Sequence, residues 1–198
     1  MAFETVKKNL EKHGYTVKNF ATGAEAAEYL NSEIDGMTVG IGGSGTVKDI
    51  GAYELLSSHN TVYWHWMQEP DEARKNAMST DVYLTSVNAL AESGEMVNID
   101  GAGNRVAATL FGHKKVYFIV GRNKLVKTYE DAVWRARNIA APGRARQMNR
   151  KTPCAVNADR CYDCRSPERI CRALTVLWCK PSPIEHMEIV LVDEELGY

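Results

Sequence analysis

The strongest constraint on the fold is that short apolar segments alternate with helical segments along most of the chain. Between the apolar segments, apolar side chains recur at helical spacing. This alternation predicts an α/β fold that is Rossmann-like, with a mostly parallel sheet flanked by helices. The segments of strand character are residues 15–20, 37–41, 61–66, 81–87, 94–100, 115–121 and 186–198. The helical patterns are residues 3–13, 22–30, 70–78, 104–111, 128–141 and 166–178.

Length and composition limit the class of protein. A chain of 198 residues is long enough for one substantial core, so we expect a single domain over residues 1–198. A composition shift marks residues 142–172 as a small insert rich in cysteine and arginine, a cysteine-rich module near the C-terminal end. Charged residues make up 25% of the chain and the formal net charge is −1, which gives no indication of nucleic acid as a partner.

The predicted compartment is a reducing cytoplasm, with no membrane association. Apolar runs stay far below the roughly 18 residues that a transmembrane helix needs. The first fifteen residues form an amphipathic pattern and lack the apolar core of a secretory signal.

A glycine-rich loop follows the predicted strand at residues 37–41. Glycines allow close backbone approach, and hydroxyl and N–H groups at such a turn can hold a phosphate or carboxylate. The loop matches neither a Walker A sequence nor the spacing of a dinucleotide-binding turn, so a plain tight turn stays an alternative. Its candidate ligand-binding residues are Gly42, Gly43, Ser44, Gly45 and Thr46.

Two further polar loops follow predicted strands. In the first, two glycines and an Asn-Arg pair open a helix directly after Asp100, which suits an anionic ligand and makes Asp100 a candidate acid or base. The second loop ends the strand at residues 115–121. Because the carboxyl ends of parallel strands share one edge, we expect all three loops to form one crevice. The candidates from these loops are Gly101, Gly103, Asn104, Arg105, Asn123 and Lys124.

Four of the five cysteines lie between residues 153 and 171. Four thiolates in a short segment can hold an iron–sulfur cluster or a tetrahedral zinc ion. The spacing, C-x6-C-x2-C-x6-C, differs from common zinc and ferredoxin patterns; we favour an iron–sulfur cluster, with zinc, free thiols or a redox disulfide as alternatives. The predicted ligands are Cys154, Cys161, Cys164 and Cys171.

The sequence also predicts the environments of His65 and Cys179. If residues 61–66 are a strand, His65 points away from Trp64 and Trp66 and is a core histidine more readily than a catalytic base. Cys179 follows the last predicted helix and is expected to be a buried spare thiol.

Several of these stretches together resemble one known family over nearly the whole chain. The stretches are "VGIGGSGT", "VYLTSVNALAESGEMVNIDGAGNRVAA", "KVYFIVGRNKLV", "AVWRARNIAAP", the cysteine segment and "LVDEELGY". They resemble the short, cysteine-containing form of the LUD, or lactate utilisation protein C, family. That family is similar in fold to glucosamine-phosphate isomerase, ribose-phosphate isomerase and family I coenzyme A transferases.

The resemblance implies a role in oxidation of lactate or a related 2-hydroxy acid to pyruvate. The chain would be an accessory or electron-transfer component beside iron–sulfur partner subunits, with an anionic small molecule in its crevice; a homodimer is also expected. In the transferases a glutamate in a Glu-Asn-Gly-like turn is the nucleophile, and Glu92-Ser93-Gly94 resembles that turn with Ser in place of Asn.

Two other functions stay open at this point. One is a stand-alone enzyme on a phosphosugar or an acyl-coenzyme A, using Glu92 or Asp100 as acid, base or nucleophile. The other is a zinc-stabilised interaction module without redox chemistry.

Overall fold

The computed structural model describes residues 3–198, and its centre is a parallel sheet of six strands in the order β1-β10-β7-β4-β2-β3. All five strand pairs are parallel, as the alternating pattern predicts. The strands are β1 (Thr16–Phe20), β2 (Thr38–Ile41), β3 (Thr61–Trp64), β4 (Val82–Thr85), β7 (Lys115–Gly121) and β10 (His186–Val192). The predicted α/β fold with helices flanking a parallel sheet is therefore confirmed.

A second, smaller sheet has the strand order β8-β5-β6-β9. Its central pair is an antiparallel hairpin, and β9 adds antiparallel to β6 while β8 pairs parallel with β5. The strands are β5 (Ala89–Ala91), β6 (Met96–Asp100), β8 (Leu125–Val126) and β9 (Ala173–Leu177). This sheet brings the end of the cysteine-bearing segment next to the strand that ends at Asp100.

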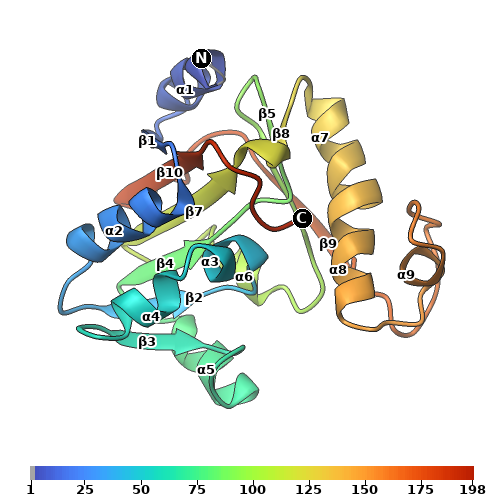
Figure 1. Ribbon diagram of the computed structural model, residues 1–198, viewed down its shortest axis with the longest axis horizontal. Coiled ribbons are helices and arrows are strands. Elements are labelled where there is room, and N and C mark those ends of the chain that lie inside the picture. The colour runs from blue at the N-terminus through green and yellow to red at the C-terminus, as the bar shows by residue number, and fades with distance from the viewer. Residues whose placement is uncertain (1–2) are drawn as a thin grey trace.

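The helices complete the layers on either side of the sheets (Figure 1). Before β7 the chain forms α1 (Glu4–Lys12), α2 (Gly23–Glu33), α3 (Gly45–Asp49), α4 (Ala52–Leu56), α5 (Pro70–Ala77) and α6 (Asn104–Ala108). After β7 it forms the 3₁₀ turn η1 (Arg122–Lys124), α7 (Tyr129–Arg135), the π-helical turn η2 (Ala136–Ala140), α8 (Ala141–Gln147) and α9 (Pro153–Asn157). Within residues 3–198, none of these helices is long and apolar enough to span a bilayer.

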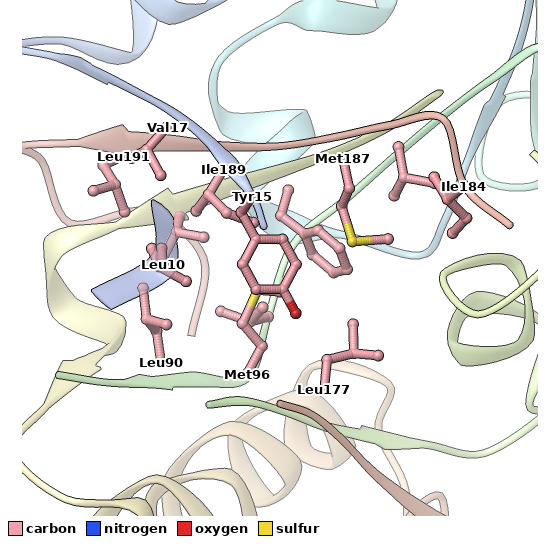
Figure 2. Close-up of a cluster of buried hydrophobic side chains, with 14 of the residues drawn as sticks. Leu10, Tyr15, Val17, Leu90, Met96, Leu177, Ile184, Met187, Ile189 and Leu191 are labelled. Atoms are coloured by element: carbon pink, nitrogen blue, oxygen red, sulfur yellow. The ribbon is translucent and has the colours of Figure 1, made fainter. Parts of the chain in front are cut away.

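Two large cores lie on opposite faces of the main sheet. One is formed with α2, α3 and α4 and includes Leu30, Val47 and Trp64. The other fills the space between the two sheets, where Leu90, Met96 and Leu177 face β10 (Figure 2). A small alanine-rich core packs α7 against the outer face of the second sheet. The second sheet is thus held firmly between the main sheet and α7.

Local sequence signals explain several helix boundaries. Thr22 and Glu25 form a capping box at the start of α2, and Pro70 occupies the first turn of α5. Pro142 lies in the first turn of α8, where it has no N–H to continue the hydrogen-bond ladder of the preceding turn. The π-helical turn η2 directly precedes it, and α7, η2 and α8 run on as one rod (Figure 1).

Three expectations were wrong. The helix predicted over residues 166–178 does not form, because Ala173–Leu177 instead pairs along β6 as strand β9. The helix predicted to end at residue 141 runs on through α8 to Gln147. Cys179 is exposed instead of buried, since it follows the edge strand β9.

Candidate functional site

A cavity of about 440 Å³ lies where the three polar loops of the sequence meet. The glycine loop contributes Gly43 to Gly45 after β2, and the end of β6, the loop after it and the start of α6 contribute residues 99–102, 104 and 105. Lys124 enters from the turn after β7. The predicted convergence of these loops at the carboxyl edge of the sheet is therefore what the structure shows.

The glycine loop is fixed by its own hydroxyl groups. Ser44 caps α3 by accepting a hydrogen bond from the N–H of Val47 at 3.2 Å, and both Ser44 and Thr46 are buried. The Thr46 side chain lies behind the cavity wall and contacts the Leu196 carbonyl at 3.3 Å. Gly197 crosses this point with φ +64°, and a Cβ there would lie 2.6 Å from the Thr46 Oγ1. Only glycine fits that position without strain.

Lys124 is the most unusual side chain of the cavity. It is 4% exposed, and its Nζ donates to the Thr46 Oγ1 at 2.6 Å and to the Ser86 Oγ at 2.8 Å. Lys124 takes part in none of the ion pairs of residues 3–198, so no carboxylate of these residues lies within ion-pair distance of its Nζ. Burial and the nearby guanidinium groups of Arg135 and Arg105 lower the pKa of Lys124 to about 7. The amine is thus poised between its charged and neutral forms at neutral pH.

Arg105 and Asp100 hold the second loop in place. Asp100 accepts hydrogen bonds from the N–H groups of Ala102 and Gly103 with one oxygen and from that of Val106 with the other. Arg105 donates to the Ser86 and Ile99 carbonyls at 3.2 and 2.7 Å, and its Nε lies 3.7 Å from the Asp100 carboxylate. Both side chains of this pair are thus largely engaged in supporting the loop.

The lining of the cavity is rich in positive charge. Seven basic side chains border it, against two acidic ones, Asp100 and Glu168. Arginine and lysine around a partly enclosed space create a positive potential that attracts anions. The basic residues are Arg74, Arg105, Lys124, Arg144, Arg150, Arg169 and Arg172.

An aromatic pair forms part of the cavity rim. β3 ends at Trp64, so His65 and Trp66 lie in the following turn and both line the cavity; the expectation that His65 points away from Trp66 as in a strand is wrong. Burial and the charges of Arg74 and Arg144 lower the pKa of His65 to about 4, so it is neutral at pH 7. Arg144 stacks over the Trp66 ring at 4.5 Å from its centroid. A second, adjoining cavity of about 570 Å³ shares Trp66 and Arg144.

Most of the predicted ligand-binding residues lie at the cavity, and the rest lie just outside its lining. The residues on its surface are Gly43, Ser44, Gly45, Gly101, Asn104, Arg105 and Lys124, with the candidate acid or base Asp100. Gly42, Thr46, Gly103 and Asn123 do not line it. Asn123 accepts from the N–H of Leu196 and so anchors the segment that carries Gly197.

Glu92 lies elsewhere. It is in the turn between β5 and β6, its carboxylate pairs with Lys127, and it does not line the cavity. Glu92 therefore lies at a hairpin tip, and the structure does not bring it together with Asp100.

Sequence reasoning missed several basic groups of the site. Arg144 and Arg150 come from α8 and the loop behind it, and Arg169 and Arg172 come from the cysteine-bearing segment. The excess of basic residues over residues 143–172 was the available signal.

The cysteine-bearing segment, residues 150–172, lies beside α8 and forms one wall of the cavity. All its thiols are reduced and half-buried, and they contact different groups: Cys154 lies 3.3 Å from the Thr152 hydroxyl, whereas Cys161 accepts from the N–H of Asp163. No three His, Cys, Asp or Glu side chains gather as a metal-binding group anywhere in residues 3–198. As arranged here the thiols do not fit a cluster, and the iron–sulfur or zinc site stays a prediction.

The fold and site together define an α/β protein with a cation-rich cavity at the carboxyl edge of a parallel sheet. The family model of the LUD domain matches residues 3–192, so the chain belongs to the LUD domain family. A search of curated proteins finds no match. Among solved structures, the chain is similar to a DUF162 family protein from Deinococcus radiodurans, with a TM-score of 0.59 and 13% identity over 96% of each chain. At that identity the likeness supports the fold alone.

Proposed function

We propose that this LUD domain protein takes part in the utilisation of lactate or a related 2-hydroxy acid by binding a small carboxylate or phosphate in the 440 Å³ cavity. The observation that carries the proposal is the buried amine of Lys124, which has two hydroxyl partners and, within residues 3–198, no carboxylate in ion-pair contact. A buried ammonium is costly without an opposite charge, and a bound anion would supply one.

Charge and size support a small anion as the ligand. The side chains around the cavity are mostly cationic, and arginine donors match carboxylate and phosphate oxygens. A cavity of about 440 Å³ lies within the usual range for small-molecule sites, roughly 300 to 1,000 Å³. The family's link to lactate utilisation favours a 2-hydroxy or 2-oxo acid over other anions.

The proposed setting is a cytoplasmic system with iron–sulfur partner subunits. The cysteine spacing and the absence of a nicotinamide or flavin fingerprint favour an accessory or electron-transfer role over hydride transfer. The engaged carboxylate of Asp100 and the remote position of Glu92 argue against the alternative, an enzyme that uses either as nucleophile.

Titration calorimetry with lactate, pyruvate and inorganic phosphate tests the proposal. We expect saturable binding of at least one of these anions, weakened at least tenfold by Arg144→Met, which removes a cation from the rim. Arg122→Met is the matched control, because Arg122 is an exposed arginine paired with Asp193 outside the cavity. Absence of binding by all three anions, or equal weakening by the two variants, would contradict the proposal.

A further inference from the structure

We propose that Lys124 forms a reversible imine with the ketone of a 2-oxo acid held in the cavity. The inference rests on the proposed function and deepens it, because it names the ligand class as an acid that carries a ketone beside its carboxylate. It concerns the Nζ of one lysine out of the twelve in the chain.

Geometry makes Lys124 different from an ordinary anion-binding lysine. Its side chain lines the cavity and is 4% exposed, and its Nζ lies between two hydroxyl groups, those of Thr46 and Ser86. Two donor positions of the amine are occupied by these hydroxyls. Within residues 3–198, Lys124 forms no ion pair with a carboxylate, which would hold the amine in its charged form.

Electrostatic surroundings favour the neutral, nucleophilic amine. The charged groups that face Lys124 are Arg135 from α7 and Arg105 from α6, both of which disfavour the ammonium, while Asp49 from α3 favours it. Burial acts in the same direction as the two arginines, and the pKa of about 7 leaves a large neutral fraction at pH 7.5. Desolvation and neighbouring cations are the means by which imine-forming lysines are activated.

The chemical step balances without an added oxidant or reductant. The neutral Nζ attacks the ketone carbon, and the ketone oxygen takes up a proton to give a carbinolamine. The C–O bond then breaks, water leaves with the second amine proton, and a C=N bond forms. The Thr46 and Ser86 hydroxyls lie within 2.8 Å of the Nζ and are placed to relay these protons.

The carboxylate of the ligand has suitable partners in the same cavity. Arg144 and Arg150 line it and come from α8 and the loop that follows. A 2-oxo acid would satisfy both kinds of group at once, its ketone at the amine and its carboxylate at a guanidinium. A 2-hydroxy acid offers a carboxylate and a hydroxyl but no ketone, so it cannot form the imine.

Reductive trapping tests the inference on the full chain. The protein is incubated with pyruvate and sodium cyanoborohydride at pH 7.5, and the adduct is measured by intact mass and by peptide mapping. We expect one adduct per chain, on Lys124, absent in Lys124→Met and retained in Lys127→Met, in which an exposed lysine is removed. Lowering the pH to 5.5 should slow trapping more than tenfold, because the neutral amine is depleted below its pKa of about 7.

Parallel calorimetry separates failure of the imine from failure of the binding site. Pyruvate binding with no adduct on Lys124 would overturn the imine and leave the anion site intact. Equal adducts on exposed lysines and on Lys124 would also overturn it. If the protein shows neither pyruvate binding nor an adduct while its melting transition is intact, both the imine and the anion site are overturned. If Lys124→Met loses its fold, Lys124→Gln replaces it, because the glutamine amide can still donate to the Thr46 and Ser86 hydroxyls.

Discussion

The sheet edge and the cysteine-bearing segment form facing walls of one cavity, and they are built in different ways. At the sheet edge the charged side chains have defined partners, as in the contacts of Asp100 with three N–H groups and of Lys124 with two hydroxyls. In residues 150–172 the thiols contact scattered groups and the secondary structure is limited to the short helix α9. β9 joins the two walls, because it pairs with β6 directly after this segment.

This contrast separates two ways of assembling a site. Parallel strands bring their carboxyl ends to one edge whatever ligand is bound, so the cavity exists in the folded chain without a ligand. A cluster of thiols requires the metal itself to bring the ligands together. We therefore expect the cavity to depend on packing and the cysteines to depend on metal, and each variant below tests one side of that expectation.

The largest effect is expected for Arg105→Met at the sheet edge. This substitution removes the guanidinium donor of the Ile99 carbonyl, leaves the Asn98 Oδ1 with the Asn88 N–H alone, and takes the cation from the Asp100 carboxylate. Breaking a buried pair of this kind costs about 3–5 kcal/mol. Urea unfolding measures the loss, and the exposed Arg122→Met should change stability by less than about 1 kcal/mol. A loss as small as that of the control would show that the wall is not held by Arg105.

The second-largest effect is expected on the pH dependence of stability, which Lys124→Met should change. The pKa of Lys124 is about 7 in the folded chain against an ordinary value of 10.5, so the unfolded chain binds more protons between these pH values. The stability of the wild type therefore rises with pH across this window by a few kcal/mol, at about 1.4 kcal/mol per pKa unit. The variant should lack this rise in urea unfolding at pH 7 and 9. If stability changes with pH equally in the wild type and in Lys124→Met, Lys124 is not the desolvated group.

Gly101→Ala tests the contact between the two walls. A Cβ at this position would lie 2.7 Å from the Ile170 carbonyl oxygen, so the cysteine-bearing segment must move. We expect a loss of about 1–3 kcal/mol, typical of overpacking, together with weaker anion binding. Gly36→Asn is the control, because nothing lies within 4 Å of its Cβ and Asn tolerates the φ of +63° found there. Unchanged anion affinity in Gly101→Ala would show that the facing wall does not shape the cavity.

The smallest effect on stability is expected for the double variant Cys161→Ser/Cys164→Ser. Both thiols are half-buried and not bonded to each other, so the change in unfolding free energy should stay within about 0.5 kcal/mol. The spacing predicts that protein prepared without oxygen carries iron and that this variant loses it, as metal analysis with a visible spectrum can measure. Zinc in place of iron, or a wild type without metal, would contradict the cluster.

The sequence was sufficient for the parallel sheet and for the convergence of its polar loops, because both follow from strand alternation and local turn residues. It was insufficient where pairing over a long distance decided the structure. Residues 173–177 have an ambiguous pattern, and their pairing with β6 makes them a strand instead of a helix. Likewise, Arg144 and Arg172 reach the cavity through tertiary packing, which no local pattern encodes.

The central claim is that an anion binds against Lys124, and proton uptake on binding tests it most directly. Lactate is titrated into the protein at pH 8 in buffers of different ionisation enthalpy, since lactate has no ketone to form an imine. The amine is mostly neutral in the free protein because its pKa is about 7, and a bound anion would raise that pKa. We predict uptake of up to about one proton per bound lactate in the wild type and none in Lys124→Met. Lactate binding with no proton uptake by the wild type would contradict the account.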